Sequence, residues 1–415
     1  MNFLFIHQNF PGQFCHLASE LAEQGHQVVA LGINEVDKNK PLSDKVKHIR
    51  YKLGRGSTKD VHPLATEVEA KVIRGEACAA ACNQLKENGF VPDLIYGHPG
   101  WGEIMFIKTV YPDVPLVCFQ EYFYNEEGYD AGFDMEFTDH RNWAKKSSLI
   151  MKNAYLLVTL EQTDWNVSPT HFQAATYPDK WKHKFSIIHD GIDCNKATPS
   201  DTNISITLPD GAVVTNKDNV ITFINRRLEP YRGVHSFIRS IPRIQKQNPD
   251  AHIVIIGGQK GTSYGARCPK GEWKDKFLEE IEGQYDPTLV HFTDTVAHDK
   301  FIRLMQISSC HVYLTYPFVL SWSLLEAMAC GCPIVGSNTE PVTEMIKNNN
   351  NGVIVDFFSP TDIAASVTEM IKNKPLARAY GINARQTILN NYSLESCLSK
   401  QVNLIKMLTG KNIPL

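Results

Sequence analysis

Hydrophobic and polar residues follow one another along the chain in blocks that predict strands and helices in alternation. Residues 2–7 form a short apolar block, and after a Pro-Gly turn residues 13–25 carry apolar side chains at every third or fourth position. Gly25 ends this predicted helix, and residues 26–32 form the next apolar block. A strand–helix–strand unit of this kind is typical of a doubly wound parallel sheet.

The alternation continues and restarts once. Further strands are predicted in the first half at 92–97, 115–120, 154–160 and 185–192, and in the second half at 220–225, 252–258, 288–296, 310–316, 332–337 and 352–357. Between the two series, residues 195–219 are polar and contain no long apolar run. We therefore expect an α/β protein of two Rossmann-like, doubly wound domains that face each other across a cleft.

The expected first domain is 1–196 and the expected second domain is 197–392. Residues 393–415 contain a predicted helix with an apolar stripe. This helix either crosses back to the first domain or packs only on the second. Because open parallel sheets bind ligands beyond the carboxyl ends of their strands, the loops after the strands are where a site is expected.

Composition narrows the function classes. The 415 residues are 43% hydrophobic and 21% charged, with a net charge of −3, which does not favour a nucleic-acid partner, although a local groove could still serve one. The cysteines have neither zinc-ligand spacing nor a Cys-x-x-Cys pair. This scattered pattern favours a protein of a reducing compartment. No signal peptide or membrane-spanning run is recognised. We expect a cytoplasmic protein, at most peripheral at the inner membrane face.

The loop after residues 220–225 carries three arginines, Arg226, Arg227 and Arg232, before a predicted helix. Arginine side chains beside the free amides of a helix N-terminus form a natural clamp for a diphosphate. The alternative is that they pair with Glu229 or cap helices. We favour the clamp because the loop follows the carboxyl end of a strand.

Two glycines, Gly257 and Gly258, end the next predicted strand, where a glycine backbone can lie close to a ligand. The loop that follows, residues 259–272, is either a flexible solvent loop or a lid over a donor. No G-x-G-x-x-G fingerprint occurs at this turn or around Gly12, so the sequence does not favour a nicotinamide-dependent oxidoreductase.

Glu326 has two interpretations. Ser323 and Glu326 have the spacing of a capping box, in which the glutamate bonds back to the start of its helix. This helix also follows the carboxyl end of a strand, where a carboxylate could accept hydrogen bonds from a ribose diol. The spacing alone leaves both interpretations open.

Three segments resemble motifs of the retaining glycosyltransferases of the GT-B fold in family 4: NRRLEPYRG (225–233), IIHDGID (187–193) and, most specifically, LLEAMACGCPIVGS (324–337). The resemblance implies that Arg227 and Arg232 hold the diphosphate of a nucleotide sugar and that Glu326 binds its ribose. The implied base site lies at the backbone of Thr295 and Val296. The other predicted donor-binding residues are Gly12, Gly257, Gly258, Phe318, Val319, Leu320 and Ser321.

The chain departs from the family at several positions. Phe318 stands where the family usually has a glutamate that contacts the transferred sugar, so another residue does so or the sugar is held differently. Glu121 replaces a histidine that many members have near the acceptor. The resemblance places His98 near the reacting carbon, although a helix cap explains His98 equally well. The predicted catalytic residues are Arg227, Arg232, His98 and Glu121, and the acidic, aromatic loop 121–140 is expected to contact the acceptor or to be purely structural.

The resemblance implies transfer of a sugar, with retention, from a nucleotide-diphosphate sugar to an acceptor hydroxyl. A UDP-sugar donor is favoured, and the expected acceptor is a glycan, a lipid-linked molecule or a small molecule. No cofactor and no metal are expected, because arginines and helix amides stabilise the leaving diphosphate and no Asp-x-Asp triplet is present. The alternatives are a transferase acting on DNA or protein and a catalytically silent nucleotide-sugar-binding protein, the latter motivated by Phe318.

Overall fold

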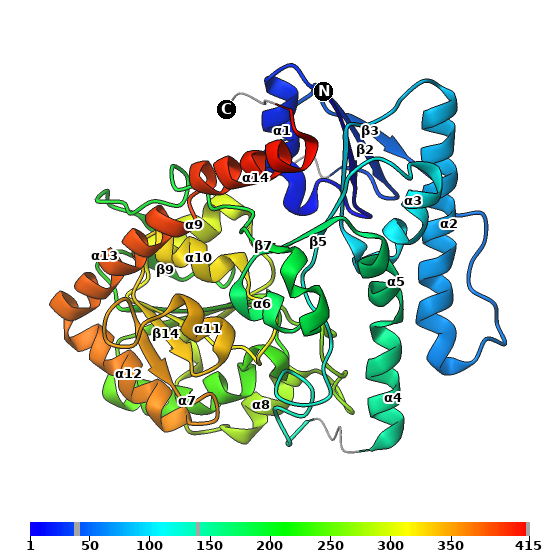
Figure 1. The fold of residues 1–415 in the computed structure, drawn as a ribbon. Helices are drawn as coiled ribbons and strands as arrows, with labels where there is room; N and C mark the ends of the chain where they lie inside the picture. The colour runs from blue at the N-terminus through cyan, green and yellow to red at the C-terminus, as the bar shows by residue number, and fades with distance from the viewer. Residues whose placement is uncertain (37–41, 138–141, 412–415) are drawn as a thin grey trace. The chain divides into compact units, whose positions relative to one another are not determined.

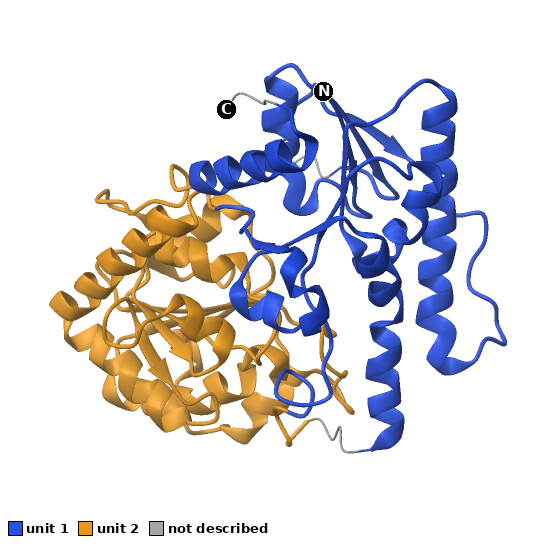
Figure 2. Ribbon diagram, viewed as in Figure 1, with its two compact units in different colours: residues 1–132, 138–191, 394–415 blue, residues 133–137, 192–393 orange. Residues whose placement is uncertain are grey.

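The computed structural model describes residues 1–36, 42–137 and 142–411 (Figure 1). Its internal contacts divide the chain into two compact units, which Figure 2 distinguishes by colour. Unit 1 contains residues 1–132, 138–191 and 394–415, and unit 2 contains residues 133–137 and 192–393. Each unit is built on its own parallel sheet.

Unit 1 has a sheet of seven parallel strands. In spatial order they are β3 (Lys47–Arg50), β2 (Gln27–Gly32), β1 (Asn2–Ile6), β4 (Leu94–Gly97), β5 (Leu116–Phe119), β6 (Trp165–Ser168) and β7 (Phe185–Ile187). Its α-helices are α1 (Cys15–Glu23), α2 (Thr66–Glu87), α3 (Ile107–Val110), α4 (Trp143–Lys152), α5 (Ala154–Gln162), α6 (His171–Ala175) and α14 (Leu394–Thr409). Its 3-10 helices are η1 (Gly12–Phe14), η2 (Pro63–Ala65), η3 (Pro99–Trp101), η4 (Glu103–Phe106) and η5 (Asp179–Lys184).

Strand β1 is one continuous apolar run because of its place in the sheet. Its side chains alternate between the two faces, and both faces are covered. Phe3 and Phe5 pack with residues of α1 and α14 on one face, whereas Leu4 and Ile6 pack with residues of α2 and α3 on the other. A side chain of this strand is therefore buried whichever face it points to, and no polar position is required until the strand ends.

The strand predicted at 154–160 is wrong, because these residues form helix α5. Tyr155, Leu156, Thr159 and Leu160 are buried, whereas Leu157 and Val158 are exposed. This is the spacing of one helix face, which a short apolar run does not reveal by composition alone.

Unit 2 has a sheet of six parallel strands. In spatial order they are β12 (Val290–Thr293), β11 (His252–Gly258), β10 (Val220–Arg227), β13 (Cys310–Tyr313), β14 (Ile334–Ser337) and β15 (Val353–Val355), and each lies where the sequence predicts a strand. An antiparallel hairpin, β8 (Ser205–Thr207) and β9 (Val213–Thr215), precedes them. The helices are α7 (Val234–Gln247), α8 (Trp273–Glu280), α9 (His298–Ile307), α10 (Trp322–Ala329), α11 (Glu340–Met345), α12 (Pro360–Lys372) and α13 (Lys374–Asn391), with the 3-10 helices η6 (Pro230–Arg232) and η7 (Pro287–Leu289).

Both sheets reverse their strand order at one point, between β1 and β4 in unit 1 and between β10 and β13 in unit 2. At such a switch point the loops that leave the two carboxyl ends diverge, and open α/β sheets bind ligands there. The switch points therefore direct attention to the loops after these four strands.

The terminal helix α14 belongs to unit 1. The Tyr96 hydroxyl donates a buried hydrogen bond of 3.0 Å to Gln401 Oε1 on this helix. Leu404 and Ile405 join the apolar cluster on the α1 face of the sheet. Helix α14 therefore packs on the same apolar core as strand β1.

Candidate active site

Arg232 lies at the switch point of unit 2. It ends η6, and Gly233, with a left-handed φ of 70°, turns the chain into α7. A side chain at Gly233 would also meet Leu314 at 2.4 Å, so this turn requires glycine. Arg232 Nη1 donates to Thr315 Oγ1 at 2.8 Å and to the Val319 carbonyl at 3.0 Å, which fixes the guanidinium between the loops after β10 and β13.

The Arg232 side chain is buried without a matching negative charge. The residue is 5% exposed, and among the residues that the structure describes no carboxylate forms an ion pair with it. Its guanidinium carbon instead lies 5.1 Å from the centre of the Tyr264 ring and 5.8 Å from that of Phe318. Because an uncompensated buried charge is costly, an anionic ligand at this position would be stabilising.

Glu229 does not neutralise the arginines, as the alternative interpretation of this loop required. It is fully buried, and its carboxylate accepts the backbone N–H groups of Ser263 at 2.9 Å, Tyr264 at 3.2 Å and Gly265 at 2.8 Å. Three backbone donors around one carboxylate form a firm anchor. The loop 259–272 is thus held in its middle, and this anchor places Tyr264 beside Arg232.

Arg227 is exposed at the end of β10, unlike Arg232. Its Nη1 donates to the Lys260 carbonyl at 2.9 Å. Gly258 makes room for this arginine, because a Cβ there would lie 2.4 Å from Arg227 Nη1. Gly257 packs on the Asn225 carbonyl, 2.7 Å from where its Cβ would be. The two glycines therefore accommodate neighbouring protein groups.

Phe318 belongs to an aromatic cluster around Arg232. Its ring packs edge-on at 5.1 Å from both Tyr231 and Tyr264, and the side chain is buried. An apolar, aromatic wall at this position suits a buried guanidinium. Together with the Val319 carbonyl and Leu320, it forms the loop that leads into α10.

The capping-box interpretation of Glu326 is wrong. Ser321, not Ser323, is the N-cap of α10, and its hydroxyl accepts the N–H of Ser323 at 3.3 Å. The helix thus begins earlier than the motif predicts, and Glu326 lies beyond its first turn. Glu326 Oε1 instead lies 2.6 Å from Nε2 of His298, the first residue of α9. This hydrogen bond raises the pKa of His298 against the opposing effect of burial.

The loop between β12 and α9 contains the predicted base-binding residues. Thr295 is exposed, and Val296 packs partly on the core of unit 2. His298 follows in the same segment and lies outside the three recognised motifs. Its position at the start of a helix that follows a strand was the available signal.

The loops after β1, β4 and β5 of unit 1 bring together a second cluster. The ring of His98 lies 5.2 Å from that of His7 and 4.7 Å from that of Trp101. His98 Nδ1 accepts the N–H of Gly100 at 3.1 Å, so the predicted capping role is also present. His98 Nε2 is buried 3.3 Å from Glu121 Oε2, but the pair is not aligned for a hydrogen bond, and Nε2 has no other partner within 1–36, 42–137 and 142–411.

Glu121 is fixed from the other side by Gln13, whose Nε2 donates to Glu121 Oε1 at 2.5 Å. Gln13 Oε1 in turn lies 3.0 Å from His7 Nε2. Burial raises the pKa of Glu121, but His98 and the Gln13 hydrogen bond outweigh it and lower the pKa overall. The cluster therefore presents an ionised carboxylate beside an imidazole, which can accept and donate hydrogen bonds to a hydroxyl.

Gly12 belongs to this second cluster, whereas the other predicted donor residues all belong to unit 2. Its φ is 49°, and a Cβ at Gly12 would lie 2.4 Å from His7 Nε2. Glycine is therefore needed at this position for both the backbone and the His7 ring.

Glu103 begins η4 and is fully buried, and its Oε1 accepts the Tyr51 hydroxyl at 3.2 Å. Its Oε2 has no hydrogen-bond partner within the described residues. Burial raises the pKa of Glu103, so the folded protein holds this proton more tightly than the unfolded chain does, and stability falls as pH rises from the unfolded value of about 4.3.

We therefore expect Glu103→Gln to stabilise the protein at pH 8 by about 1–3 kcal/mol, because glutamine carries no charge to bury. The advantage should disappear near pH 4, where the wild-type carboxyl is protonated. Urea unfolding at the two pH values checks this. An equal effect of the substitution at both would show that Glu103 does not titrate in this range.

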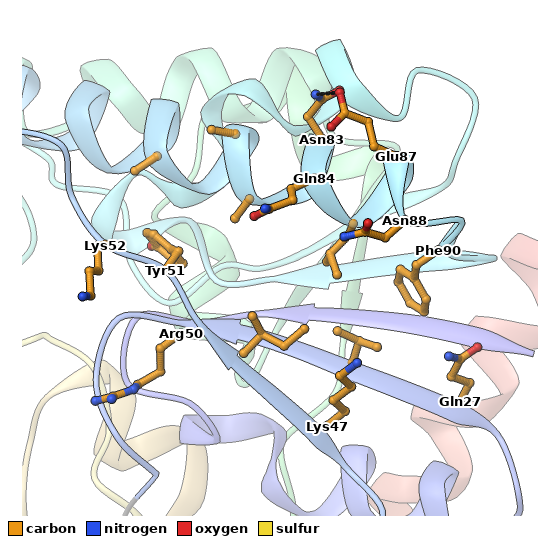
Figure 3. Close-up of a pocket in the computed structure, with 16 residues that line it drawn as sticks. Gln27, Lys47, Arg50, Tyr51, Lys52, Asn83, Gln84, Glu87, Asn88 and Phe90 are labelled. Atoms are coloured by element: carbon orange, nitrogen blue, oxygen red, sulfur yellow. Dashed lines mark hydrogen bonds between the residues drawn. The ribbon is translucent and has the colours of Figure 1, made fainter.

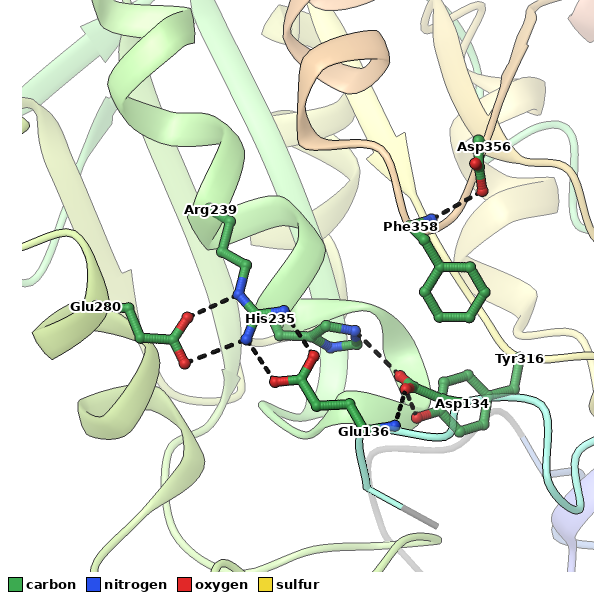
Figure 4. Close-up of polar contacts among 8 residues, drawn as sticks. All are labelled: Asp134, Glu136, His235, Arg239, Glu280, Tyr316, Asp356 and Phe358. Atoms are coloured by element: carbon green, nitrogen blue, oxygen red, sulfur yellow. Dashed lines mark hydrogen bonds and ion pairs between the residues drawn. The ribbon is translucent and has the colours of Figure 1, made fainter. Parts of the chain in front are cut away.

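The predicted acceptor loop, residues 121–140, is divided between the units, and its residues 138–140 lie outside the described part of the chain. Residues 133–137 belong to unit 2, where Arg239 of α7 binds both Glu136, at 2.6 and 2.8 Å, and Glu280 (Figure 4). Asp134 accepts the Tyr316 hydroxyl at 2.8 Å and lies 3.2 Å from His235 Nε2. This stretch is firmly anchored, and Tyr316 links it to the loop that contains Phe318.

A groove of about 710 Å³ lies in unit 1 (Figure 3). It runs between β2 and β3 on one side and α2 on the other, and none of the predicted site residues lines it.

No helix within the described ranges is both long and apolar enough to cross a membrane.

Two family models match the chain. Residues 24–197 match the glycosyl transferase family 4 group and residues 210–387 match the glycosyl transferases group 1. The chain belongs to the group 1 glycosyltransferase family, as the motifs indicated. An uncharacterized glycosyltransferase of Methanocaldococcus jannaschii is 27% identical over 185 residues, which cover 44% of each protein. The chain spans about half the length of the curated relatives it matches.

Two solved structures cover almost the whole chain. Sucrose-phosphate synthase from Thermosynechococcus elongatus has a TM-score of 0.72 at 16% identity, with 99% of each chain covered. Anabaena HepE, solved in complex with UDP, has a TM-score of 0.68 at 14% identity, with 98% of this chain and 100% of that chain covered. These similarities confirm the predicted fold class, an α/β protein with two Rossmann-like domains of the GT-B type.

Proposed function

We propose that the protein is a retaining, metal-independent glycosyltransferase of the cytoplasm, which moves a sugar from a UDP-sugar to an acceptor hydroxyl in the synthesis of a glycan or glycoside. The observation that carries the proposal is Arg232, a buried cation with no carboxylate partner among the described residues, at the switch point of unit 2. UDP is favoured as the nucleotide because the structurally similar HepE was solved with UDP and with UDP-glucose.

In the proposed donor complex the diphosphate neutralises Arg232, with Arg227 as a second, exposed contact. Glu326 accepts the ribose hydroxyls, and the backbone near Thr295 and Val296 contacts the base. The aromatic wall of Phe318 lies beside the diphosphate and the sugar. Much of the binding energy then comes from compensating a charge that is already buried.

In the proposed reaction the acceptor oxygen forms a bond to the anomeric carbon as the bond from that carbon to the diphosphate oxygen breaks. The acceptor proton passes to the departing phosphate on the same face, so the anomeric configuration is retained and no protein nucleophile is needed. Arg232 stabilises the charge that develops on the diphosphate. His98 and Glu121 of unit 1 orient the acceptor hydroxyl through hydrogen bonds.

Incubation with UDP-glucose or UDP-N-acetylglucosamine and a panel of glycan, lipid-linked and small acceptors tests this function. We expect acceptor-dependent release of UDP and a product whose anomeric proton, observed by NMR, has the α-configuration of the donor. A β-linked product would reject the retaining reaction. Nucleotide binding without release under any condition would instead support a silent sugar-nucleotide-binding protein.

A further inference from the structure

We propose that His298 is a positioning residue for the donor site, which holds the Glu326 carboxylate so that the site selects ribonucleotides over 2′-deoxyribonucleotides. This inference rests on the proposed function. It assigns a task to a residue that none of the motifs contains.

The first observation is the geometry of the pair. His298 Nε2 lies 2.6 Å from Glu326 Oε1, and the two residues come from different helices, α9 and α10. A contact between two helices fixes the carboxylate more firmly than a rotamer preference alone. Only Oε1 is engaged, since Oε2 has no hydrogen-bond partner in the described part of the chain. One oxygen is therefore held and the other is available.

The second observation is that the pair is open to a ligand. The His298 side chain is 53% exposed and that of Glu326 is 17% exposed. A pair that served only to hold α9 and α10 together would not need to be open to solvent at a candidate site. His298 engages Oε1, and the second oxygen of this partly exposed carboxylate can accept a hydrogen bond from a ligand.

The electrostatic surroundings of His298 favour its donor role. Glu326 raises the pKa of His298 most and Asp299 raises it further, whereas burial and Lys196 lower it. The ring of Phe301 lies 5.9 Å from the imidazole. The imidazole can donate a hydrogen bond from Nε2 to Oε1 whether it is neutral or protonated. Because its pKa is raised, the protonated form, which makes the stronger charge-assisted bond, persists to a higher pH.

The chemical consequence concerns the 2′-hydroxyl. A ribose diol donates hydrogen bonds to a carboxylate oxygen, and a nucleotide without its 2′-hydroxyl loses one of them. A site built to bond a hydroxyl rejects the analogue that lacks it, because the polar group of the site is left unpaired. Discrimination requires the carboxylate to be held in one orientation, and His298 does this.

Calorimetric binding of UDP and 2′-deoxy-UDP to the full chain tests the inference. We expect wild type to bind UDP at least about tenfold more tightly than 2′-deoxy-UDP. His298→Ala should weaken UDP binding by about tenfold while hardly changing that of 2′-deoxy-UDP, so the preference is lost. His298→Gln, whose amide can replace Nε2–H, should restore most of it. Arg303→Gln, at an exposed position further along α9, is the matched control and should keep the wild-type preference.

Each other result has one meaning. If His298→Ala binds UDP as tightly as wild type or more tightly, His298 does not position the carboxylate and the inference is overturned. An equal loss for both nucleotides would show a general structural role and would also overturn it. If wild type binds neither nucleotide, both the proposed function and this inference are wrong. If wild type binds UDP and 2′-deoxy-UDP equally tightly, only the inference is wrong.

Discussion

Replacing Arg232 by methionine should greatly weaken the binding of UDP while leaving the folded protein almost as stable as wild type. The guanidinium is buried without an ion-pair partner in the described residues, so its removal relieves an uncompensated charge. Methionine fills a similar volume but leaves Thr315 Oγ1 and the Val319 carbonyl without their donor. These two effects oppose each other, and we expect the unfolding free energy to change by less than about 2 kcal/mol.

The effect on the ligand is not balanced in this way. Charge-assisted bonds to a diphosphate are the strongest contacts that the proposed donor site offers, and we expect affinity for UDP to fall at least about a hundredfold. Calorimetric titration gives the affinity, and urea unfolding gives the stability.

Arg239→Met is the matched control. Arg239 lies on α7, the helix that follows Arg232 in the chain, but it is paired with Glu136 and Glu280, and its side chain is 28% exposed. We expect this variant to lose about 1 kcal/mol of stability and to keep its affinity for UDP. Wild-type affinity in Arg232→Met would contradict the donor-site assignment.

Replacing Glu229 by glutamine should produce the opposite pattern, a large loss of stability. Its fully buried carboxylate accepts three backbone N–H groups, from Ser263 to Gly265. Glutamine keeps the shape but turns one acceptor into a donor that faces other donors. We expect a loss of about 3 kcal/mol in unfolding free energy, since hydrogen bonds to a charged, buried acceptor are costly to break.

Donor affinity should fall as well, because the same loop places Tyr264 against the Arg232 side chain. Glu272→Gln is the control from this loop. Glu272 is half-buried and accepts the N–H of Gly261 at 2.8 Å, so we expect its loss to cost less than about 1 kcal/mol. Urea unfolding measures both losses of unfolding free energy. Equal losses in the two variants would show that the burial of Glu229 does not make its hydrogen bonds more stabilising than those of Glu272.

The sequence predicted the sheet of unit 2 better than that of unit 1, and burial explains the difference. Every strand of the six-stranded sheet of unit 2 contains an apolar run, whereas β3 of unit 1 is an edge strand with the sequence Lys-His-Ile-Arg and gives no such signal. Strand β6 was also missed, because it contains Asn166 and Ser168, both fully buried. Asn166 accepts a hydrogen bond from Gln120, a partner that no local pattern can indicate.

The candidate site was predictable wherever one loop contains its chemistry. The arginines before α7 and the glutamate of α10 stand in recognisable motifs. The partners that give these residues their roles come from elsewhere, as with Glu229 and the loop at Ser263, or Glu326 and His298. A local rule can place a charged side chain in a loop, but the fold decides whether that charge is paired.

The donor site is tested most directly by the thermal stability of the wild-type chain in the presence of UDP, GDP, ADP or TDP and the corresponding nucleotide sugars. A ligand at about a hundred times its dissociation constant adds about 2.7 kcal/mol of stability to the folded protein. We expect a clear increase in melting temperature with UDP and UDP-sugars, and a smaller one or none with the others. No increase with any nucleotide would contradict the assignment of Arg232 to a donor diphosphate and, with it, the proposed transferase.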